Sequence, residues 1–367
     1  MLFTCRKSFL IYITVGNNLL YWFYSPLLVM NRFRAYYDYG IVIEYGNNRF
    51  IIDPLKKPSG SFNAVLITHG HKDHVNPRAL HNISPLIMSN ETAAIIRARD
   101  GDYLRHIAVN PGSRLFINDV LIESFNAGHV IGSLSYILDF GDLRVGVTGD
   151  FNVESSIILD GAKGLDVDVL IMESTYGDPD YVFPMRHEVY NKLRAFVEDG
   201  VKDGIAVFMG QPLGRGQELV ALFKDYSIYI EPSIKVINNA LGLRHGMVAD
   251  KLPPAGSVLI TGVPRDITRF VKVLRNRYRK VRITALSGMY AKQSRAARLR
   301  QLGIDAIPLS SHSDFPGLVD FVLSSGAKFV YTVYGSATKF AKYLRNELNI
   351  MARPLPKRGQ LTMDYFL

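Results

Sequence analysis

The chain has 367 residues, of which 48% are hydrophobic and 21% are charged. At roughly 100 to 200 residues per domain this length predicts two or three domains, and the composition excludes a disordered or fibrous chain. The single cysteine, Cys5, excludes a disulfide framework and a cysteine-rich zinc site, and it fits a reducing compartment such as the cytoplasm. The net charge of +10 is compatible with a polyanionic partner.

The first element is an apolar stretch near the N-terminus. Residues 8–31 contain no charge, which is long enough for a membrane span of about 20 residues. Asn17, Asn18 and Pro26 weaken that interpretation, because interior amides are costly in a bilayer. Three interpretations stay open: a membrane anchor, an ordered structural extension, or a native start at Met30. We expect no membrane contact unless this stretch is an anchor.

Beyond residue 30, short β-branched runs alternate with helical patterns, which is typical of α/β layer proteins. The first part is mostly strands, predicted at Ile41–Glu44, Arg49–Ile52, Ala64–Thr68, Leu86–Ser89, Val120–Phe125, Ser135–Asp139, Val145–Thr148 and Val169–Glu173. After residue 180 longer helices separate strands predicted at Ala206–Met209, Ile228–Ile230, Val258–Thr261, Ile283–Leu286, Ala306–Leu309 and Phe329–Val333. The later part therefore reads as doubly wound.

The strongest motif is HGHKDH at residues 69–74, which directly follows a buried-strand pattern. If the chain stays extended there, His69, His71 and Asp73 share one face and His74 points to another. Such a cluster can serve two metal ions at once. Imidazole and carboxylate without thiolate suit Zn²⁺, with Mn²⁺ or Fe as competitors.

Three further polar residues end apolar runs: Asp53, His129 and Asp150. Taken alone, an Asp such as Asp53, which precedes a proline, is more often a turn residue than a ligand. The histidine cluster gives all three residues weight as candidate site residues.

Together these motifs resemble the metallo-β-lactamase superfamily, whose motif order is Asp, His-x-His-x-Asp-His, His and Asp. MESTYG at 172–177 resembles the acidic motif that opens the β-CASP nucleases, and SSHSDF at 310–315 resembles the second motif of that group. The match covers most of residues 40–350. In texture the chain is similar to compact exonucleases associated with DNA ligases and to RNA 3′-end processing nucleases.

The resemblance implies an α/β fold: an αββα sandwich interrupted by a Rossmann-like β-CASP insert. The sandwich would comprise residues 31–180 and 307–367. The insert would span 181–306, and residues 1–30 would be an apolar extension.

The resemblance also implies roles for single residues. His69, His71 and His129 would hold one metal ion. The second ion would be held by Asp73 and His74, and Asp150 would bridge the two. The implied cofactor is Zn²⁺, one or two ions per chain, with Mn²⁺ as an alternative.

Four residues would act in or beside the reaction: Asp73, His312, Glu173 and Asp53. Asp53 would orient a ligand histidine. Glu173 would support the site and orient His312, which would protonate the leaving oxygen or bind a nonbridging one. A helix capped by Ser313 or Asp314 is expected to follow.

The third β-CASP motif departs from the family. Relatives commonly have His or Val where this chain has Tyr334, followed by Gly335 and Ser336. The usual extra ligand of the second metal is therefore absent, and we expect that ion to be weakly held. A noncovalent role is favoured for Tyr334, because a free phenol has a pKa near 10.

The charge is concentrated in one window. Residues 265–300 carry twelve basic residues and one acidic residue, a net charge of +11 that exceeds the +10 of the whole chain. Helical spacing predicts that Arg275 and Arg279 share a face, as do Arg295 and Arg298. The predicted nucleic-acid contacts are Arg215, Arg275, Arg279, Arg295, Arg298, Tyr334, Gly335 and Ser336.

The resulting prediction is a metal-dependent nuclease that cleaves single-stranded RNA or DNA with a metal-activated water, as an exonuclease and with endonuclease activity left open. It would serve RNA processing or DNA repair. Two alternatives stay open. One is a noncatalytic nucleic-acid-binding subunit, and the other is a small-molecule metallo-hydrolase. Oligomeric state is left open.

Overall fold

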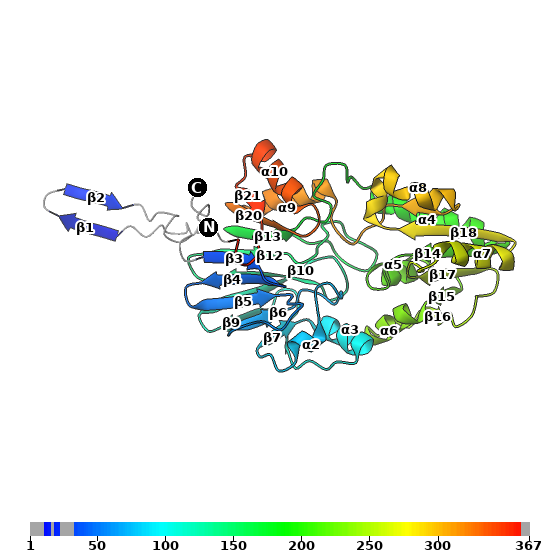
Figure 1. The fold of residues 1–367 in the computed structure, drawn as a ribbon, viewed down its shortest axis with the longest axis horizontal. Helices are drawn as coiled ribbons and strands as arrows, with labels where there is room; N and C mark the ends of the chain where they lie inside the picture. The colour runs from blue at the N-terminus through cyan, green and yellow to red at the C-terminus, as the bar shows by residue number, and fades with distance from the viewer. Residues whose placement is uncertain (1–10, 16–17, 23–32, 361–367) are drawn as a thin grey trace, which may run out of the picture.

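The computed structural model describes residues 11–15, 18–22 and 33–360 (Figure 1). In the apolar N-terminal stretch, β1 (Ile11–Val15) and β2 (Asn18–Trp22) pair antiparallel. The described parts of this stretch are thus strands and not a helix. No described helix is both long and apolar enough to cross a membrane. Met30 and the remainder of the stretch lie outside the described residues.

The HGHKDH motif and His129 follow strands of two sheets, one with six strands and one with seven. The first has the order β3-β4-β5-β6-β7-β8, formed by Phe33–Tyr37, Ile41–Tyr45, Asn48–Ile52, Ala64–Leu66, Leu86–Met88 and Ile107–Ala108. The second has the order β21-β20-β13-β12-β11-β10-β9, formed by Ala352–Pro354, Phe329–Val333, Val169–Glu173, Arg144–Val147, Leu134–Asp139, Val120–Asn126 and Arg114–Ile117.

The two sheets pack face to face, because alternate residues of their strands are apolar on both sides. In β5, Phe50 and Ile52 enter the core between the sheets. Ile51 points the other way, into a cluster beneath α2 (Pro77–Leu80) and α3 (Asn90–Asp100). The outer face of the second sheet is covered by α9 (Phe315–Ser325) and α10 (Ala337–Leu348). The result is four layers, helix, sheet, sheet and helix (Figure 1).

A third sheet lies in the chain between β13 and β20 and has six strands, all parallel. Its order is β16-β15-β17-β14-β18-β19, formed by Met247–Val248, Ile228–Ile230, Ser257–Thr261, Gly204–Met209, Lys280–Leu286 and Asp305–Ile307. On one face pack α4 (Arg186–Val201), α5 (Arg215–Leu222) and α6 (Pro232–Ala240). On the other face pack α7 (Ile267–Arg277) and α8 (Gln293–Gln301), the latter preceded by a 3₁₀ turn, Gly288–Ala291.

This sheet has helices on both faces, as the sequence predicts, but not the strand order of the Rossmann fold. Numbered within the segment, the Rossmann order is 3-2-1-4-5-6, whereas here the fourth strand, β17, lies between β15 and β14. The spacing of apolar runs predicts strands but carries no information about which strands become neighbours.

Each strand predicted from the sequence overlaps an observed one, and α9 is capped as expected by Asp314, whose carboxylate accepts from the Gly317 amide at 3.0 Å. The pairing of Arg275 with Arg279 on a helix is wrong. Helix α7 ends at Arg277, and Tyr278 is extended (φ −120°, ψ 141°). Its phenol is buried and donates to the Pro253 carbonyl, so the chain leaves the helix before Arg279.

Candidate metal centre

The predicted metal ligands, with Asp53, Glu173, His312 and Tyr334, converge in one region, although they are far apart in the chain. Each follows the end of a strand or opens the loop after it: Asp53 after β5, residues 69–74 after β6, His129 after β10, Asp150 after β12, Glu173 at the end of β13, His312 after β19 and Tyr334 after β20. Although these strands belong to three different sheets, residues from the loops after β6, β12, β13, β19 and β20 line a single pocket.

Three imidazoles face one another at the centre. His69 Nε2 lies 3.0 Å from His71 Nδ1, and His129 Nε2 lies 3.1 Å from the same atom. His69 and His129 are buried, and a carboxylate oxygen of Asp150 completes a group of four ligand atoms, all within 4.8 Å of one another.

The outer nitrogens of these rings have acceptors that fix the tautomers. His129 Nδ1 donates to the Ser311 carbonyl at 2.8 Å, and His71 Nε2 faces the Leu213 carbonyl at 3.3 Å. His69 Nδ1 lies 3.0 Å from the Thr68 hydroxyl. The inner nitrogens therefore present lone pairs to one another, and all three could bind a cation held there.

Asp53 holds the next pair of ligands. Its carboxylate accepts from the Thr68 amide at 2.7 Å, from the Thr68 hydroxyl at 2.6 Å and from His74 Nδ1 at 2.9 Å. Because the Thr68 hydroxyl donates its proton to Asp53, it can only accept a hydrogen bond from His69 Nδ1. One buried carboxylate thus orients two histidines, His74 directly and His69 through Thr68. Asp53 keeps this position with a positive φ of 52°, a conformation that non-glycine residues seldom adopt.

Asp150 lies between the two groups. Its Oδ1 is 3.2 Å from His74 Nε2, and its Oδ2 is 3.6 Å from His69 Nε2 and 3.7 Å from His129 Nε2. The loop that carries Asp150 approaches the Thr68 loop closely, because a Cβ on Gly149 (φ 58°) would lie 2.6 Å from Thr68 Cβ. Asp73 is exposed and lines the same pocket, but it is outside the described groups of converging ligand atoms.

Burial holds the central imidazoles neutral. It lowers the pKa of His69 and of His129 well below the usual value, and it lowers the pKa of His71 to about 4. Neutral imidazole is the form that binds metal. His74 differs: burial lowers its pKa, but the charges and hydrogen bonds of Asp150 and Asp53 prevail and raise it.

His312 reaches the pocket from the opposite wall and is held by Glu173. His312 Nδ1 lies 2.7 Å from Glu173 Oε1, and Nε2 lies 3.9 Å from Asp150 Oδ2. Burial lowers the pKa of His312, but the charges of Glu173 and Asp150 outweigh it and raise the pKa to about 8. Glu173 is itself fixed by the Phe151 amide at 3.0 Å and by the Thr175 hydroxyl.

Tyr334 covers the side of the pocket next to His74, with ring centroids 5.1 Å apart. It also has a positive φ, 61°. Burial, followed by the charges of Asp53 and Asp150, raises the pKa of its phenol well above 10. The phenol is therefore neutral near pH 7 when only protein groups surround it.

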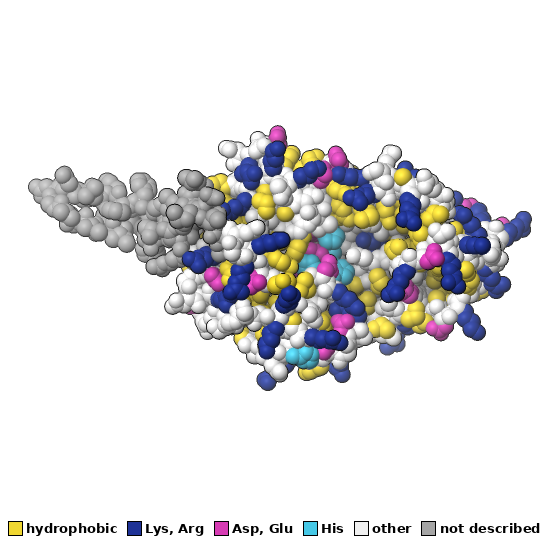
Figure 2. Space-filling view, viewed as in Figure 1, with side chains coloured by type: hydrophobic (Ala, Val, Ile, Leu, Met, Phe, Trp, Pro, Cys, Tyr) yellow, Lys and Arg dark blue, Asp and Glu magenta, His cyan; other side chains and the backbone are white. Residues whose placement is uncertain are grey.

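The pocket is a cavity of about 640 Å³ between the first two sheets and the third-sheet segment. Figure 2 shows histidine side chains near the centre of this face. Its lining includes Tyr334 and Gly335, and Arg215 is the one arginine or lysine among the described residues that line it. Ser336 is the N-cap of α10.

The other predicted basic contacts do not line this cavity. Arg275, Arg279, Arg295 and Arg298 are exposed on or next to α7 and α8. Figure 2 shows Lys and Arg side chains around the end of the molecule where Figure 1 places α7. At these four positions the basic window, residues 265–300, thus lies outside the lining of the cavity, and their contact with nucleic acid stays a prediction.

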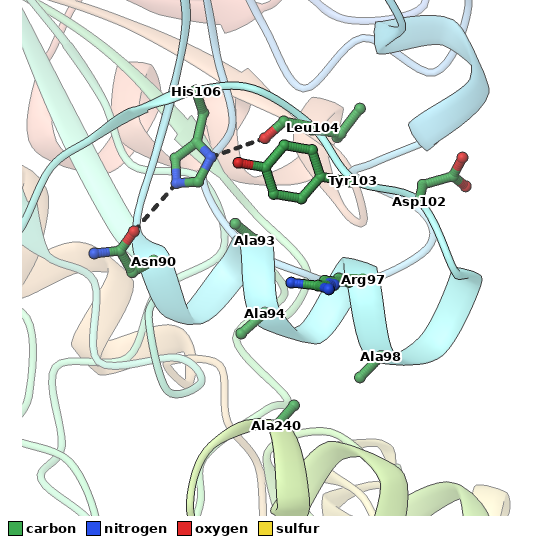
Figure 3. A pocket seen from close by; sticks show the side chains of 10 residues that line it. All are labelled: Asn90, Ala93, Ala94, Arg97, Ala98, Asp102, Tyr103, Leu104, His106 and Ala240. Atoms are coloured by element: carbon green, nitrogen blue, oxygen red, sulfur yellow. Dashed lines mark hydrogen bonds between the residues drawn. The ribbon is translucent and has the colours of Figure 1, made fainter.

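A second cavity, of about 480 Å³, lies between α3 and Ala240 of α6 (Figure 3). Its histidine, His106, is bonded to the Leu104 carbonyl at 2.9 Å and to the Asn90 side chain at 3.2 Å. None of the four converging histidines lines this cavity.

Sequence reasoning missed the residues that hold the imidazoles from outside: Thr68, Ser311 and Leu213. The two carbonyl contacts leave no signal in the sequence, because any residue supplies a carbonyl. Thr68 was recognisable as a hydroxyl next to the first histidine, but not as the link from His69 to Asp53.

Comparison with known proteins places this geometry in a family. No protein-family model matches the chain. It is 27% identical over 315 residues to a protein named "Probable DNA ligase" from Opitutus terrae, covering 81% of this chain and 29% of that one. It is 27% identical to an "RNase J-like protein" from Methanocaldococcus jannaschii, covering 44% of each chain. It is 30% identical to "Cleavage and polyadenylation specificity factor subunit 3-II" from Arabidopsis thaliana, covering 49% of this chain and 35% of that one.

The chain thus spans between 29% and 44% of the length of these relatives. Its fold is also that of a protein of unknown function from Enterococcus faecalis, with a TM-score of 0.58, 14% identity, and coverage of 88% of this chain and 97% of the other.

The four layers, the motif order and these relatives define a metallo-β-lactamase superfamily protein. Within that superfamily the chain belongs to the β-CASP group.

Proposed function

We propose that the chain is a metal-dependent nuclease that hydrolyses phosphodiester bonds of single-stranded RNA or DNA. The observation that carries the proposal is the set of inward-facing nitrogens of His69, His71, His129 and His74 around Asp150, in a cavity also lined by His312. Relatives named for RNA cleavage and for DNA ligation support both substrates.

The donor set fits the expected metal ions. His69, His71, His129 and one oxygen of Asp150 would hold the first ion, since nitrogen and oxygen ligands without sulfur suit Zn²⁺ or Mn²⁺. His74 and the other Asp150 oxygen, with Asp73 moving in from the cavity wall, would hold the second. When bound, such ions lower the pKa of a water and polarise a phosphate.

The protein groups then have separate tasks. His312, with Nδ1 donating to Glu173, presents Nε2 to the cavity and can give a proton to the leaving oxygen. Asp53 keeps His74 and His69 oriented. Tyr334 remains protonated and donates a hydrogen bond to a phosphate oxygen. Because a protonated phenol adds no anionic ligand, we expect the second ion to be held weakly.

The strand would be bound by groups around this centre. Gly335 lines the cavity and Ser336 precedes α10, whose first amides face outward at a helix N-terminus. Arg275, Arg279, Arg295 and Arg298 would contact phosphates beyond the cavity, which requires a strand longer than the cleft.

We assign residues 181–306, which hold all of the third sheet except the last residue of β19, to a β-CASP insert. Residues 31–180 and 307–367 would form the metallo-β-lactamase core. We place the protein in the cytoplasm, and exonucleolytic action from an end is the expected mode.

The test is cleavage of end-labelled single-stranded RNA and DNA with Zn²⁺ or Mn²⁺. We expect His71→Ala and His312→Ala to abolish or strongly reduce cleavage. His81→Ala is the matched control, because His81 is exposed and pairs with Asp102 outside the cavity. Cleavage that persists in His71→Ala would overturn the proposal. No cleavage of either polymer by the wild type would favour a noncatalytic binding subunit or a small-molecule hydrolase.

A further inference from the structure

The cavity is lined by a buried arginine, Arg215, of which two guanidinium nitrogens lack acceptors among the described residues. Arg215 is the first residue of α5, is 4% exposed, and lines the cavity. Its Nε and Nη1 atoms are buried and have no hydrogen-bond partner among the described residues. Buried donors without acceptors are costly, and more so when they carry charge.

Glu218, the buried carboxylate whose charge acts most on Arg215, already has other partners. Glu218 Oε1 accepts from Arg186 and, at 2.6 Å, from the Tyr190 hydroxyl. Arg186 also contacts Glu154 at 3.3 Å and the Ser310 carbonyl at 2.7 Å. Of these two buried arginines, Arg186 is thus fully partnered inside the protein, whereas Nε and Nη1 of Arg215, which lines the cavity, have no partner among the described residues.

The backbone makes room for this side chain. Gly210 follows β14, and a Cβ there would lie 3.0 Å from Arg215 Cγ and 3.2 Å from Cδ. The N-cap, Gly214, has a φ of 90°, which favours glycine. The side chain of Arg215 therefore lies against Gly210, and a Cβ at that position would push it away by a few tenths of an ångström.

The surroundings suit an anion. Tyr176, Ser287 and Tyr290 line the same cavity. Burial raises the pKa of Tyr176 and of Tyr290, so both phenols are donors near pH 7. The Tyr176 ring centroid is 6.0 Å from that of His312, which puts this wall beside the metal centre.

We propose that Arg215, with Tyr176 and Tyr290, forms a binding site for a second phosphate of the strand, on the third-sheet side of the metal centre. Each of the two unpartnered donors, Nε and Nη1, can give one charge-assisted hydrogen bond to a phosphate oxygen. That the phosphate belongs to a nucleic acid rests on the proposed function. The presence of the anion site does not.

Phosphate binding to the full-length, metal-free protein tests the site. The probe is inorganic phosphate, followed by the rise in thermal midpoint and by calorimetry. We expect Arg215→Met to weaken binding about 10-fold to 100-fold, the usual effect of losing charged hydrogen bonds. Arg194→Met is the control, since Arg194 is exposed on α4 of the same segment. Equal binding by Arg215→Met and the wild type would overturn the proposal.

Two further variants keep the test decisive if Arg215→Met does not fold. Arg215→Lys keeps the charge but replaces the guanidinium with a single ammonium group. Gly210→Ala places a Cβ against the Arg215 side chain and displaces it. We expect both to bind phosphate more weakly than the wild type, and unchanged binding in both would overturn the site.

Short single strands with a 5′-phosphate, a 3′-phosphate or neither identify the phosphate. If Arg215→Lys weakens binding only of one phosphorylated end, the site holds that terminal phosphate. If all three strands lose affinity equally, it holds an internal phosphodiester. Strands whose binding is insensitive to Arg215 would overturn the assignment to nucleic acid. Phosphate binding without any strand cleavage would count against the nuclease and leave the anion site standing.

Discussion

Asp53 Oδ2 lies 2.9 Å from Nδ1 of His74, and the same carboxylate reaches His69 through the Thr68 hydroxyl. One acidic side chain therefore sets the tautomer of one imidazole in each half of the proposed two-metal centre. Its effect on the metal is indirect, since it orients the ligands.

Replacing Asp53 by Asn should weaken zinc binding by about 10-fold to 100-fold, the usual cost of losing such an orienting partner. The fold should persist, because the amide oxygen still accepts one hydrogen bond. Competition with a chromophoric chelator measures the affinity. Asp119→Asn, which alters an exposed contact with Asn48, serves as control. Unchanged zinc affinity in Asp53→Asn would show that Asp53 orients nothing.

Thr68 gives a sharper test of the relay. Thr68→Val keeps the shape and removes the hydroxyl, so His69 loses its acceptor and Asp53 loses a donor. Thr68→Ser keeps both bonds. We expect the valine variant to bind zinc less tightly than the serine variant, which should resemble the wild type. Equal affinities would mean that the hydroxyl is not part of the relay.

Tyr334 should not be a metal ligand. Its buried phenol has a raised pKa, so ionisation is disfavoured. We expect Tyr334→Phe to retain the zinc content of the wild type and Tyr334→His to increase it, as measured by mass spectrometry after removal of free metal. Two tightly held zinc ions in the wild type, reduced to one in Tyr334→Phe, would contradict this role.

Stability should depend on pH through Asp178. Hydrogen bonds from Lys292 at 2.8 Å and Lys339 at 2.7 Å lower the pKa of Asp178 to about 2. A depressed carboxyl pKa stabilises the fold above the unfolded pKa of about 3.9, and that stability is lost as pH falls towards about 2.

Denaturant unfolding at several pH values measures the contribution of Asp178 to the free energy of unfolding. Asp178→Asn should lower the free energy of unfolding by about 1 kcal/mol at pH 7, because one carboxylate partner of two lysines is lost. The difference in the free energy of unfolding between the wild type and Asp178→Asn should become smaller as pH falls below about 4. The control is Asp225→Asn, which alters an exposed side chain. A gap that is constant over this pH range would assign the effect to packing instead of charge.

The basic window should govern affinity for long strands. Arg275→Gln and Arg298→Gln remove exposed charges outside the cavity. Each should reduce the slope of log affinity against log salt by about 1 for a long single strand. A strand too short to leave the cleft should bind unchanged. Equal losses for both lengths would place these arginines at the cleft after all.

The sequence allowed the central residues to be predicted because each is a polar group at the end of an apolar strand. His69, His129 and Asp150 are of this kind. Because β10 and β12 both pair antiparallel with β11, His129 and Asp150 follow strands that end at the same edge of the second sheet. The Ser311 carbonyl that fixes His129 lies 182 residues away in the chain, so only the folded structure reveals it. The position of the basic window, residues 265–300, depends on where α7 packs. The number of charges in the sequence does not reveal that position.

The central claim is that the histidine cluster around Asp150 makes this chain a metal-dependent nuclease. The most direct measurement is cleavage of an end-labelled single strand by metal-depleted protein before and after Zn²⁺ or Mn²⁺ is restored. The account predicts no cleavage before, cleavage after, and none in His71→Ala under either condition. Cleavage by the metal-depleted protein, or restoration in His71→Ala equal to the wild type, would contradict it.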